Sequence, residues 1–427
     1  MAKSKQTQAP KGMHDILPEE QKYWRHILKK SESLVEDYSF EKIDTPIVES
    51  TELFIRSAGE GSDIVEKEIY SFKTRGGDDL ALRPEATASV VRAYLENGMN
   101  VRPHPAKLYY HGPMFRHDQP QQGRYRQFHQ FGVETIGDAS EIIDAELIFL
   151  AYKLLNSLGL DNYNVYINSM GDSSCRPAYL RNLRDFYKNK LKKVCAQCKV
   201  RYKKNVLRML DCKEEGCKEI NKDAPPIVDF LDEDCKNHFR RVLEILDEAK
   251  IPYILNPRLV RGLDYYTRTV FEFLPEENTG TQSTIIGGGR YDRLIDFMGG
   301  SKTPAAGWSM GIERVILALK EKNASIPEIG IKPKVFLVQL GDAAKKKSLT
   351  LFENLRKAGV EVKSSLGRDS IKSQLRIANR LGVKYTLIFG QKEALEDTII
   401  VREMETGIQE TILLNKVVED IKKRLKK

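Results

Sequence analysis

The chain has 427 residues, with 69 Lys and Arg against 60 Asp and Glu and a formal net charge of +9. This length predicts two or three domains with ample core. No run of about 18 apolar residues occurs, so a membrane-spanning helix is not expected, and the polar residues 1–12 argue against a secretion signal.

The positive charge is concentrated in two segments. Residues 176–222 hold 15 Lys and Arg against 5 Asp and Glu, residues 331–427 hold 21 against 12, and the remainder carries a net charge of −10. Two basic modules on an acidic body fit a long polyanion such as RNA better than a small acidic metabolite. A solvated surface would show the same excess, so charge alone leaves both interpretations open.

The first elements alternate between helix and strand. Residues 19–38 carry apolar side chains at nearly helical spacing, and residues 41–50 are extended. Residues 80–96 predict a strand and then a helix, with Pro84 suited to the helix start. Glu85, at this junction, is a carboxylate that can favour the helix dipole.

Residues 115–137, FRHDQPQQGRYRQFHQFGVETIG, predict a strand, a loop and a returning strand. Residues two apart share a face of a strand, so Arg126, Phe128 and Gln130 line up together. Such a face can clamp a polyanion with arginine, stack a planar base on Phe128 and hydrogen-bond a polar ligand through Gln130. The hairpin therefore predicts a nucleotide site with a second, smaller pocket, while a basic hairpin that touches RNA is the alternative.

A basic insert at about residues 173–225 follows a predicted core helix at 138–159 and a strand at 163–168. The insert is mostly helical by pattern and contains a C-x2-C-x13-C-x4-C arrangement, formed by Cys195, Cys198, Cys212 and Cys217. Four thiols in two close pairs can hold a tetrahedral zinc ion, which is favoured over disulfides in a cytosolic protein. Cysteine also serves as a small buried hydrophobe, so both interpretations remain open.

Three further segments combine strands with glycine or arginine, at residues 256–273, 283–300 and 303–319. The first predicts a strand pair around Gly262. The second predicts a strand, three glycines and a helix, an arrangement in which the backbone can approach an anionic ligand closely. The third predicts a strand and a helix that carries Glu313 and Arg314, which alone would usually form a surface pair.

Strands and helices alternate again from Lys334 to the end, with a hairpin at residues 398–414 and a final basic helix. This pattern predicts a compact α/β module. The predicted domains are therefore 1–330, including the insert at 173–225, and 334–427, with a linker at residues 331–333.

Several of these segments resemble the signatures of one enzyme family. GRYRQFHQFG at 123–132 is similar to motif 2 of class II aminoacyl-tRNA synthetases in its histidine-specific form, and RGLDYYT at 261–267 is similar to the second histidine-specific signature. GGRYD follows about twenty residues later, residues 303–319 resemble motif 3, and the first helix and strand resemble motif 1. The chain is identified as a member of the histidyl-tRNA synthetase family, of bacterial type.

The resemblance implies a class II synthetase fold. This is an α+β catalytic core whose antiparallel sheet is flanked by helices, with a helical insertion and a C-terminal α/β anticodon-binding domain. It implies that histidine and ATP form histidyl-adenylate and pyrophosphate, and that histidine then passes to the 3′ end of tRNA(His). It further implies Mg²⁺, a homodimer joined through motif 1, a cytoplasmic location and no membrane partner. Structural Zn²⁺ depends on the cysteine quartet.

The resemblance also implies roles for individual residues. Arg116 and Arg261 are the expected catalytic residues, because fixed cations at the α-phosphate stabilise the charge of the transition state. The expected histidine-binding residues are Glu85, Ala86, Thr87, Arg116, Gln130, Glu134, Arg261, Tyr265 and Tyr266. The expected ATP-binding residues are Arg116, Arg124, Phe128 and Arg314, and Gln121 is expected to contact tRNA.

Two other functions share some of these features. A histidine-sensing regulatory paralogue would resemble the catalytic core alone, with degraded arginines and no anticodon module. An RNA-binding protein without chemistry would have the two basic modules but not the arginines. Arg261, Arg314 and the C-terminal module are all present, which favours the ligase.

Overall fold

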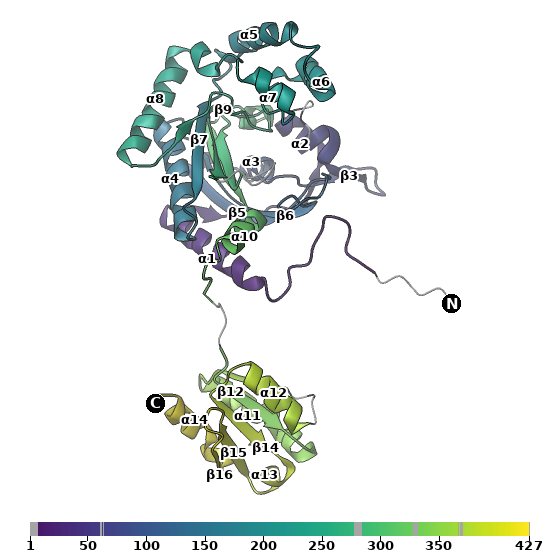
Figure 1. The fold of residues 1–427 in the computed structure, drawn as a ribbon, viewed down its shortest axis with the longest axis vertical. Helices are drawn as coiled ribbons and strands as arrows, with labels where there is room; N and C mark the ends of the chain where they lie inside the picture. Colours follow the sequence, from purple (N-terminus) through teal and green to yellow (C-terminus); the bar gives the residue numbers. More distant parts are fainter. Residues whose placement is uncertain are drawn as a thin grey trace, which may run out of the picture. The chain divides into compact units, whose positions relative to one another are not determined.

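The computed structural model describes residues 7–59, 62, 64–276, 284–327, 332–365, 367 and 370–426, so residue 331 of the predicted linker lies outside the described part. The chain divides into two units, residues 1–327 and 328–427, each with its own sheet and core (Figure 1). No helix among the described residues is long and apolar enough to cross a membrane.

The first unit is built on an eight-stranded sheet in the order β1-β5-β6-β11-β10-β9-β7-β8. Neighbouring strands from β5 to β7 are antiparallel, whereas the short edge strands β1 and β8 pair in parallel with β5 and β7. The strands are β1 (Glu41–Lys42), β5 (Ala106–Phe115), β6 (Gln127–Ile136), β11 (Ala305–Gly311), β10 (Ile286–Arg290), β9 (Thr267–Pro275), β7 (Tyr163–Ser169) and β8 (Ile254–Leu255).

Four helices cover one face of this sheet and share its main apolar core: α1 (Gln21–Asp37), α4 (Glu141–Ser157), α8 (Glu233–Glu248) and α10 (Ile312–Glu321). Buried positions in α1 recur every three or four residues, as expected for an amphipathic helix. The predicted helices at 19–38 and 138–159 are confirmed. Because Phe131 and Val133 of β6 point into this core, Gln130 and Glu134 point to the opposite face.

That opposite face carries the second core, a small sheet and the insert. The small sheet has the order β2-β4-β3, with β2 (Val48–Ser50), β4 (Asp79–Leu82) and β3 (Tyr70–Lys73), beside α2 (Thr51–Ala58), η1 (Ile64–Glu68), α3 (Thr87–Glu96), η2 (Met99–Val101) and α9 (Leu294–Phe297). The insert is helical, as predicted, with α5 (Arg176–Lys188), α6 (Ala196–Lys204), η3 (Val206–Met209) and α7 (Glu215–Asn221), and it is followed by η4 (Ile227–Phe230) (Figure 1). Helix α3 begins at Thr87, so Pro84 lies before the helix rather than at its start.

The predicted strand pair around Gly262 is wrong. Residues 256–266 form a loop, and β8 pairs with β7 instead of β9. The reason is tertiary: the Arg261 side chain makes an ion pair with Glu272 of β9, and Arg208 of the insert donates to the Arg261 carbonyl oxygen. These contacts hold the segment against the sheet without strand pairing.

The three glycines at 287–289 lie inside β10, not between a strand and a helix as predicted. A Cβ atom on Gly287 would lie 2.5 Å from a guanidinium nitrogen of Arg261, and one on Gly288 would lie 2.4 Å from the Gly307 carbonyl oxygen. Gly289 has a φ of +154° and an equally close backbone neighbour. The glycines therefore allow close packing within the sheet.

The second unit is an α/β module with strand order β13-β12-β14-β15-β16. The first three strands are parallel and the last two form an antiparallel hairpin, which confirms the predicted alternation. The short helix α13 was not predicted. The elements are β12 (Val335–Gln339), α11 (Asp342–Lys357), β13 (Val362–Ser364), α12 (Ile371–Arg380), β14 (Tyr385–Phe389), α13 (Gln391–Leu395), β15 (Thr398–Glu403), β16 (Gln409–Leu413), η5 (Leu414–Lys416) and α14 (Val417–Lys426).

Replacing Gly288 with Ala should destabilise the first unit by about 1–3 kcal/mol, because the added methyl group meets backbone atoms that cannot move aside. Denaturant unfolding followed by tryptophan fluorescence measures this, since both tryptophans, Trp24 and Trp308, belong to the first unit. Gly216→Ala is the matched control, because that Cβ meets open space on α7. A Gly288→Ala variant as stable as the control would contradict the packing argument.

Candidate active site

A cavity of about 270 Å³ lies in the first unit, over the face of the sheet opposite the four covering helices. Strands β6, β10 and β11, the start of α3, the β5–β6 loop and the 261–266 loop all contribute to its wall. Ten of the residues expected from the sequence line it: Glu85, Thr87, Arg116, Arg124, Phe128, Gln130, Arg261, Tyr265, Tyr266 and Arg314. Residues as far apart in the sequence as Glu85 and Arg314 thus line one cavity.

Three arginines crowd one part of this cavity. Burial, and after it the positive charges of Arg116 and Arg124, lower the pKa of Arg314 to about 10. Backbone carbonyls hold the guanidinium groups in place: Arg314 Nε donates to Gly123 at 3.0 Å and Nη1 to Thr284 at 2.6 Å. Cations held together in this way favour a bound polyanion, which would relieve their mutual repulsion.

Arg116, one of these three arginines, also lies over an aromatic ring. Its Nε donates to the Pro84 carbonyl at 2.9 Å, and its guanidinium carbon lies 5.3 Å from the centre of the Phe128 ring. Arg124 makes an ion pair with Asp118 and lies 3.6 Å from Glu68. Both arginines are therefore held on the hairpin, with their charges facing the cavity.

Arg261 comes from the loop on the other side of the cavity. Besides its ion pair with Glu272, its guanidinium carbon lies 5.5 Å from the centre of the Tyr266 ring. Burial lowers the pKa of Arg261, but the Glu272 carboxylate together with Tyr266 and Tyr265 raises this pKa overall. The guanidinium group is thus a permanent cation in a fixed position.

Polar groups that can hold an amino acid lie at another end of the cavity. Gln130 donates through Nε2 to Ser309 Oγ at 3.2 Å, while its buried Oε1 has no hydrogen-bond partner among the described residues. Glu85 accepts from the backbone N–H groups of Thr87 at 2.6 Å and Ala88 at 3.1 Å, and so caps α3. A carboxylate and an unused acceptor that line the same cavity suit an ammonium group.

Glu134 is buried and is not among the residues that line the cavity. Its carboxylate accepts from Thr87 Oγ1 at 2.7 Å, Tyr110 Oη at 3.3 Å and Tyr291 Oη. Burial raises the pKa of Glu134 from its ordinary 4.5 to about 8, although these hydroxyl groups lower it. Tyr110 and Tyr291 do line the cavity, and the sequence analysis missed both, although Tyr291 belongs to the GGRYD motif.

Two assignments from the sequence have different surroundings from those expected. Ala86 is fully buried as the N-cap residue of α3 and does not line the cavity. Glu313, interpreted as half of a surface pair, instead accepts from His129 through the backbone N–H at 2.9 Å and through Nδ1 at 2.8 Å. The interpretation of Glu313 and Arg314 as a surface pair is therefore wrong, because both residues line the cavity.

Comparison with known proteins matches both units. The family model described as "Histidyl-tRNA synthetase" matches residues 12–315, and the one described as "Anticodon binding domain" matches residues 334–424. The chain belongs to the histidyl-tRNA synthetase family. Its predicted fold class is thereby confirmed, and so is its assignment as an aminoacyl-tRNA ligase.

Individual relatives match nearly the whole chain. A histidine–tRNA ligase of Dehalococcoides mccartyi is 47% identical over 418 residues, which is 98% of this chain and 100% of the relative. One of Fervidobacterium nodosum is 47% identical over 413 residues, covering 96% and 97%. The crystal structure of apo S. aureus histidyl-tRNA synthetase superimposes with a TM-score of 0.79 at 37% identity, covering 97% of this chain and 99% of that one.

The relatives support the ligase over the two alternatives. A Bacillus halodurans structure described as an ATP phosphoribosyltransferase regulatory subunit/histidyl-tRNA synthetase is only 22% identical, so its TM-score of 0.64 shows a shared fold and nothing more. The ligases, in contrast, match at 42–47% identity through both units.

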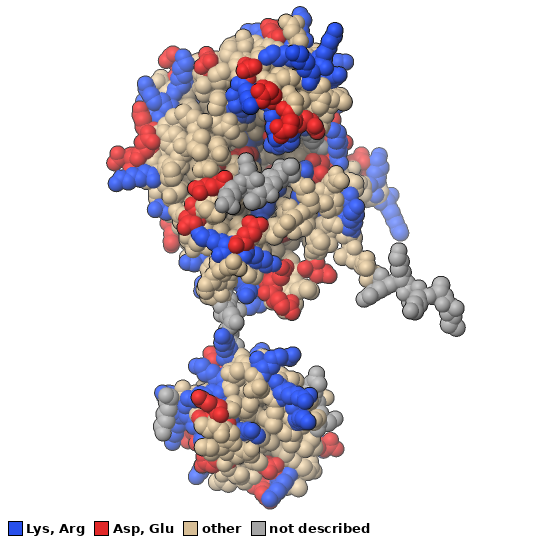
Figure 2. All heavy atoms as spheres, viewed as in Figure 1, with Lys and Arg blue, Asp and Glu red and all other residues tan. Residues whose placement is uncertain are grey.

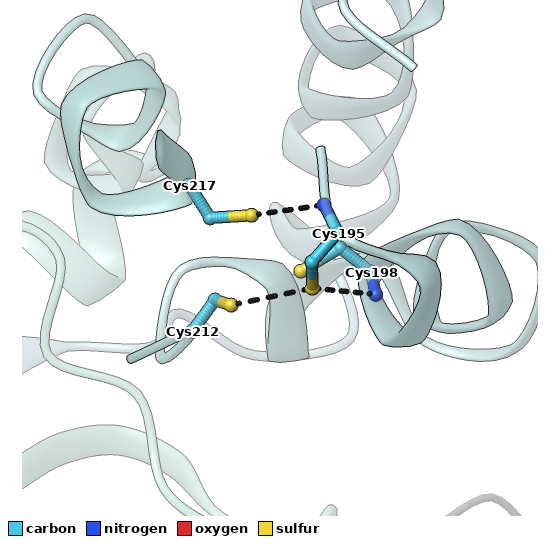
Figure 3. A group of neighbouring side chains, drawn as sticks. All are labelled: Cys195, Cys198, Cys212 and Cys217. Carbon is cyan, nitrogen blue, oxygen red and sulfur yellow. Dashed lines mark hydrogen bonds between the residues drawn. The ribbon is translucent and has the colours of Figure 1, made fainter. Parts of the chain in front are cut away.

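The cysteine quartet lies in the insert and is not part of the cavity lining. Figure 3 shows the four side chains directed toward one another, and their Sγ atoms all lie within 4.8 Å of each other. The Cys195 and Cys212 Sγ atoms are 3.8 Å apart. Backbone N–H groups of Cys198 and Cys195 donate to the sulfurs of Cys195 and Cys217 at 3.4 and 3.3 Å.

The raised pKa of Glu134 predicts how stability depends on pH. The folded protein binds this proton more tightly than the unfolded chain, so the stabilisation is full below about pH 4.5 and is lost as pH rises through about 8. Between about pH 5 and 8.5, the wild type should therefore lose more stability than Glu134→Gln, which cannot ionise.

Thermal unfolding followed by tryptophan fluorescence measures this difference. Glu248→Gln is the control, because it removes an exposed carboxylate at the end of α8 and should follow the wild type. Parallel pH profiles for the wild type and Glu134→Gln would mean that Glu134 is ionised throughout.

Proposed function

We propose that histidine is activated with ATP in the cavity over β6, β10 and β11, where the residues expected from the sequence converge. The observation that carries this proposal is the cluster of Arg116, Arg124 and Arg314 in one cavity, where burial and the two neighbouring charges lower the pKa of Arg314. A triphosphate would supply negative charge beyond the Asp118 and Glu68 carboxylates beside Arg124. Arg261, across the cavity, supplies a further cation near the amino-acid end.

In the first step, a carboxylate oxygen of histidine attacks the α-phosphorus of ATP. A new oxygen–phosphorus bond forms, the bond to the bridging oxygen breaks, and pyrophosphate leaves with the negative charge. Arg116 and Arg261 stabilise the charge that builds on the α-phosphate oxygens, and Arg124 and Arg314 hold the outer phosphates. Phe128 offers its ring to the adenine.

In the second step, a hydroxyl group of the terminal ribose of tRNA(His) attacks the activated carbonyl carbon. The ester bond forms, the bond from that carbon to the phosphate oxygen breaks, and AMP leaves while the hydroxyl proton is released to water. No side chain forms a covalent bond in either step. Because the carbonyls of Pro84, Gly123 and Thr284 already hold the arginines, little reorganisation accompanies the charge movement.

Histidine is selected by groups that match its ammonium and its ring. Gln130 Oε1 and the Glu85 carboxylate accept from the α-ammonium group, together with Thr87. Tyr266 faces the imidazole ring. Glu134 acts on the ring indirectly, through the hydroxyl groups from which it accepts hydrogen bonds. A pocket that satisfies a polar ring rejects apolar isosteres by about 10⁴ to 10⁵, so no editing domain is needed.

Mg²⁺ is expected to accompany ATP. The carboxylates that line the described cavity are those of Glu85 and Glu313, and both already accept hydrogen bonds from backbone N–H groups. This lining does not form a carboxylate cage for Mg²⁺, so we assign the ion to the phosphates of the nucleotide and derive no step through the protein's own carboxylates.

Binding of tRNA(His) is proposed for two basic modules. Figure 2 shows Lys and Arg side chains over the insert and over the second unit. Gln121, an exposed residue of the β5–β6 loop, is proposed to meet the acceptor end, and the second unit to meet the anticodon. Because phosphate contacts dominate such binding, affinity should fall as salt rises.

A homodimer and a cytoplasmic location complete the proposal. The segment that resembles motif 1 exposes two large apolar side chains, Ile47 at 41% and Val48 at 39%. Burial of these side chains against a second copy would remove apolar surface from water. The cytoplasm holds the tRNA and ATP that the reaction consumes.

Replacing Arg261 with Ala should lower histidine-dependent ATP–pyrophosphate exchange by about 10² to 10³, because a fixed cation at the α-phosphate is lost. Binding of tRNA(His) should stay nearly unchanged. Arg293→Ala is the control, since Arg293 is 48% exposed and stacks on Phe297 at the surface. Equal losses of exchange and of tRNA binding, in a variant that unfolds like the wild type, would refute the role of Arg261.

The cysteine quartet is proposed to hold one structural Zn²⁺. Four thiols with sulfurs about one tetrahedral edge apart, two of which accept backbone N–H groups, form the donor set that zinc prefers. Cys198→Ser should therefore lower the bound zinc by about one ion per chain, as measured by elemental analysis of protein purified without chelator. An unchanged zinc content would end this assignment.

A further inference from the structure

A second group of metal-binding side chains lies outside both the cavity and the cysteine quartet. It consists of Asp172, Cys175, Asp232 and Cys235, whose ligand atoms all lie within 4.8 Å of one another. We propose that these four residues bind a second zinc ion, with two thiolates and two carboxylates as ligands. The site would join the two ends of the basic insert.

The distance between the two sulfurs fits such an ion. Cys175 Sγ and Cys235 Sγ are 3.8 Å apart. A tetrahedral zinc with bonds of about 2.3 Å to sulfur separates two thiolates by about 3.8 Å. A disulfide would instead bring them to about 2.05 Å. The same 3.8 Å separates Cys195 and Cys212 in the quartet.

Both halves of the group have the same local pattern, D-x2-C, and the same kind of support. Asp232 is the N-cap residue of α8, and its Oδ1 accepts from the Cys235 N–H at 2.8 Å. In the other half, the Asp172 N–H donates to Cys175 Sγ at 3.3 Å, and the Ser174 N–H donates to Asp172 Oδ1 at 2.9 Å. Each half thus presents one carboxylate and one sulfur in a fixed arrangement.

Burial and charge also favour an ion between the two halves. Cys175 is 6% exposed and Cys235 is 1% exposed, in a small apolar cluster with Leu231. Two thiolates and two carboxylates around one Zn²⁺ would leave negative charge, and Arg268 Nη2 lies 3.4 Å from Asp172 Oδ2 to offset part of it. Such an arginine acts as an outer partner of the ligand set.

The position of the site gives it a mechanical role. Asp172 and Cys175 lie where the chain enters the insert, and Asp232 and Cys235 lie where it leaves. The insert also touches the loop that carries Arg261: Arg176 donates to the Tyr266 carbonyl at 2.5 Å, and Asn205 donates to Asp264 at 2.7 Å. A metal at the base of the insert would therefore hold the insert against that loop.

Elemental analysis of the full-length protein, purified without chelator, tests the proposal. The wild type should contain about two zinc ions per chain, one in each site. Asp232→Asn is the sharpest variant, because Asn caps a helix as well as Asp does but lacks the anionic ligand. It should lose one zinc ion, as should Cys175→Ser, and both should keep the ion of the quartet.

Cobalt substitution distinguishes the two sites by their sulfur content. The Cys198→Ser variant, stripped of zinc and reloaded with Co²⁺, retains the site with two thiolates and should show weaker thiolate-to-cobalt absorption than Asp232→Asn, which retains the site with four. Tryptophan fluorescence unfolding checks that each variant is folded.

Three results would overturn the proposal. The first is a zinc content of one per chain that Asp232→Asn and Cys175→Ser do not change. The second is loss of both ions in Asp232→Asn, which would show that the group is no separate site. The third is an intact mass lower by two hydrogen atoms that rises on reduction in the wild type but not in Cys175→Ser, which would show a disulfide.

Discussion

Repulsion among guanidinium groups is the constraint around which the cavity is organised. Arg116 and Arg314 would move apart in water, but here carbonyl oxygens of Pro84, Gly123 and Thr284 hold them. Those carbonyls belong to the strand–helix junction before α3, to the β5–β6 loop and to the segment before β10. The sheet brings these three segments together, and its stability offsets the repulsion until an anion binds.

The glycines of β10 and β11 determine how closely two side chains, Arg261 and Glu134, approach the sheet. The Arg261 guanidinium lies against Gly287, and the Glu134 carboxylate lies where a side chain of Gly307 would be. Both side chains therefore rest on bare backbone in the middle of a sheet. A Cβ atom at either position would displace Arg261 or Glu134, so the packing of the sheet and the arrangement of the proposed site depend on the same glycines.

The insert packs buried apolar side chains, such as Tyr179, Leu183 and Tyr187, into the second core of the first unit. It also carries an excess of positive charge, whose self-repulsion opposes that compact state. The cysteine quartet lies among these helices, and the Asp172–Cys235 group lies at their base. Two bound ions would oppose the charge repulsion within the insert and tie it to the loop that carries Arg261.

Local patterns were enough to predict the helices α1 and α4, the β5–β6 hairpin, the alternation of the second unit and the family, because apolar periodicity and short motifs are properties of neighbouring residues. The convergence of Arg116, Arg261 and Arg314 was expected only through resemblance. The sequence did not predict that the glycines lie inside β10 or that Glu134 lies outside the cavity lining. Nor did it predict that Tyr110 and Tyr291 belong to that lining. The sequence also did not predict that Asp172 and Cys175 lie close to Asp232 and Cys235, which follow sixty residues later. Such contacts depend on how distant segments pack, which no local pattern encodes.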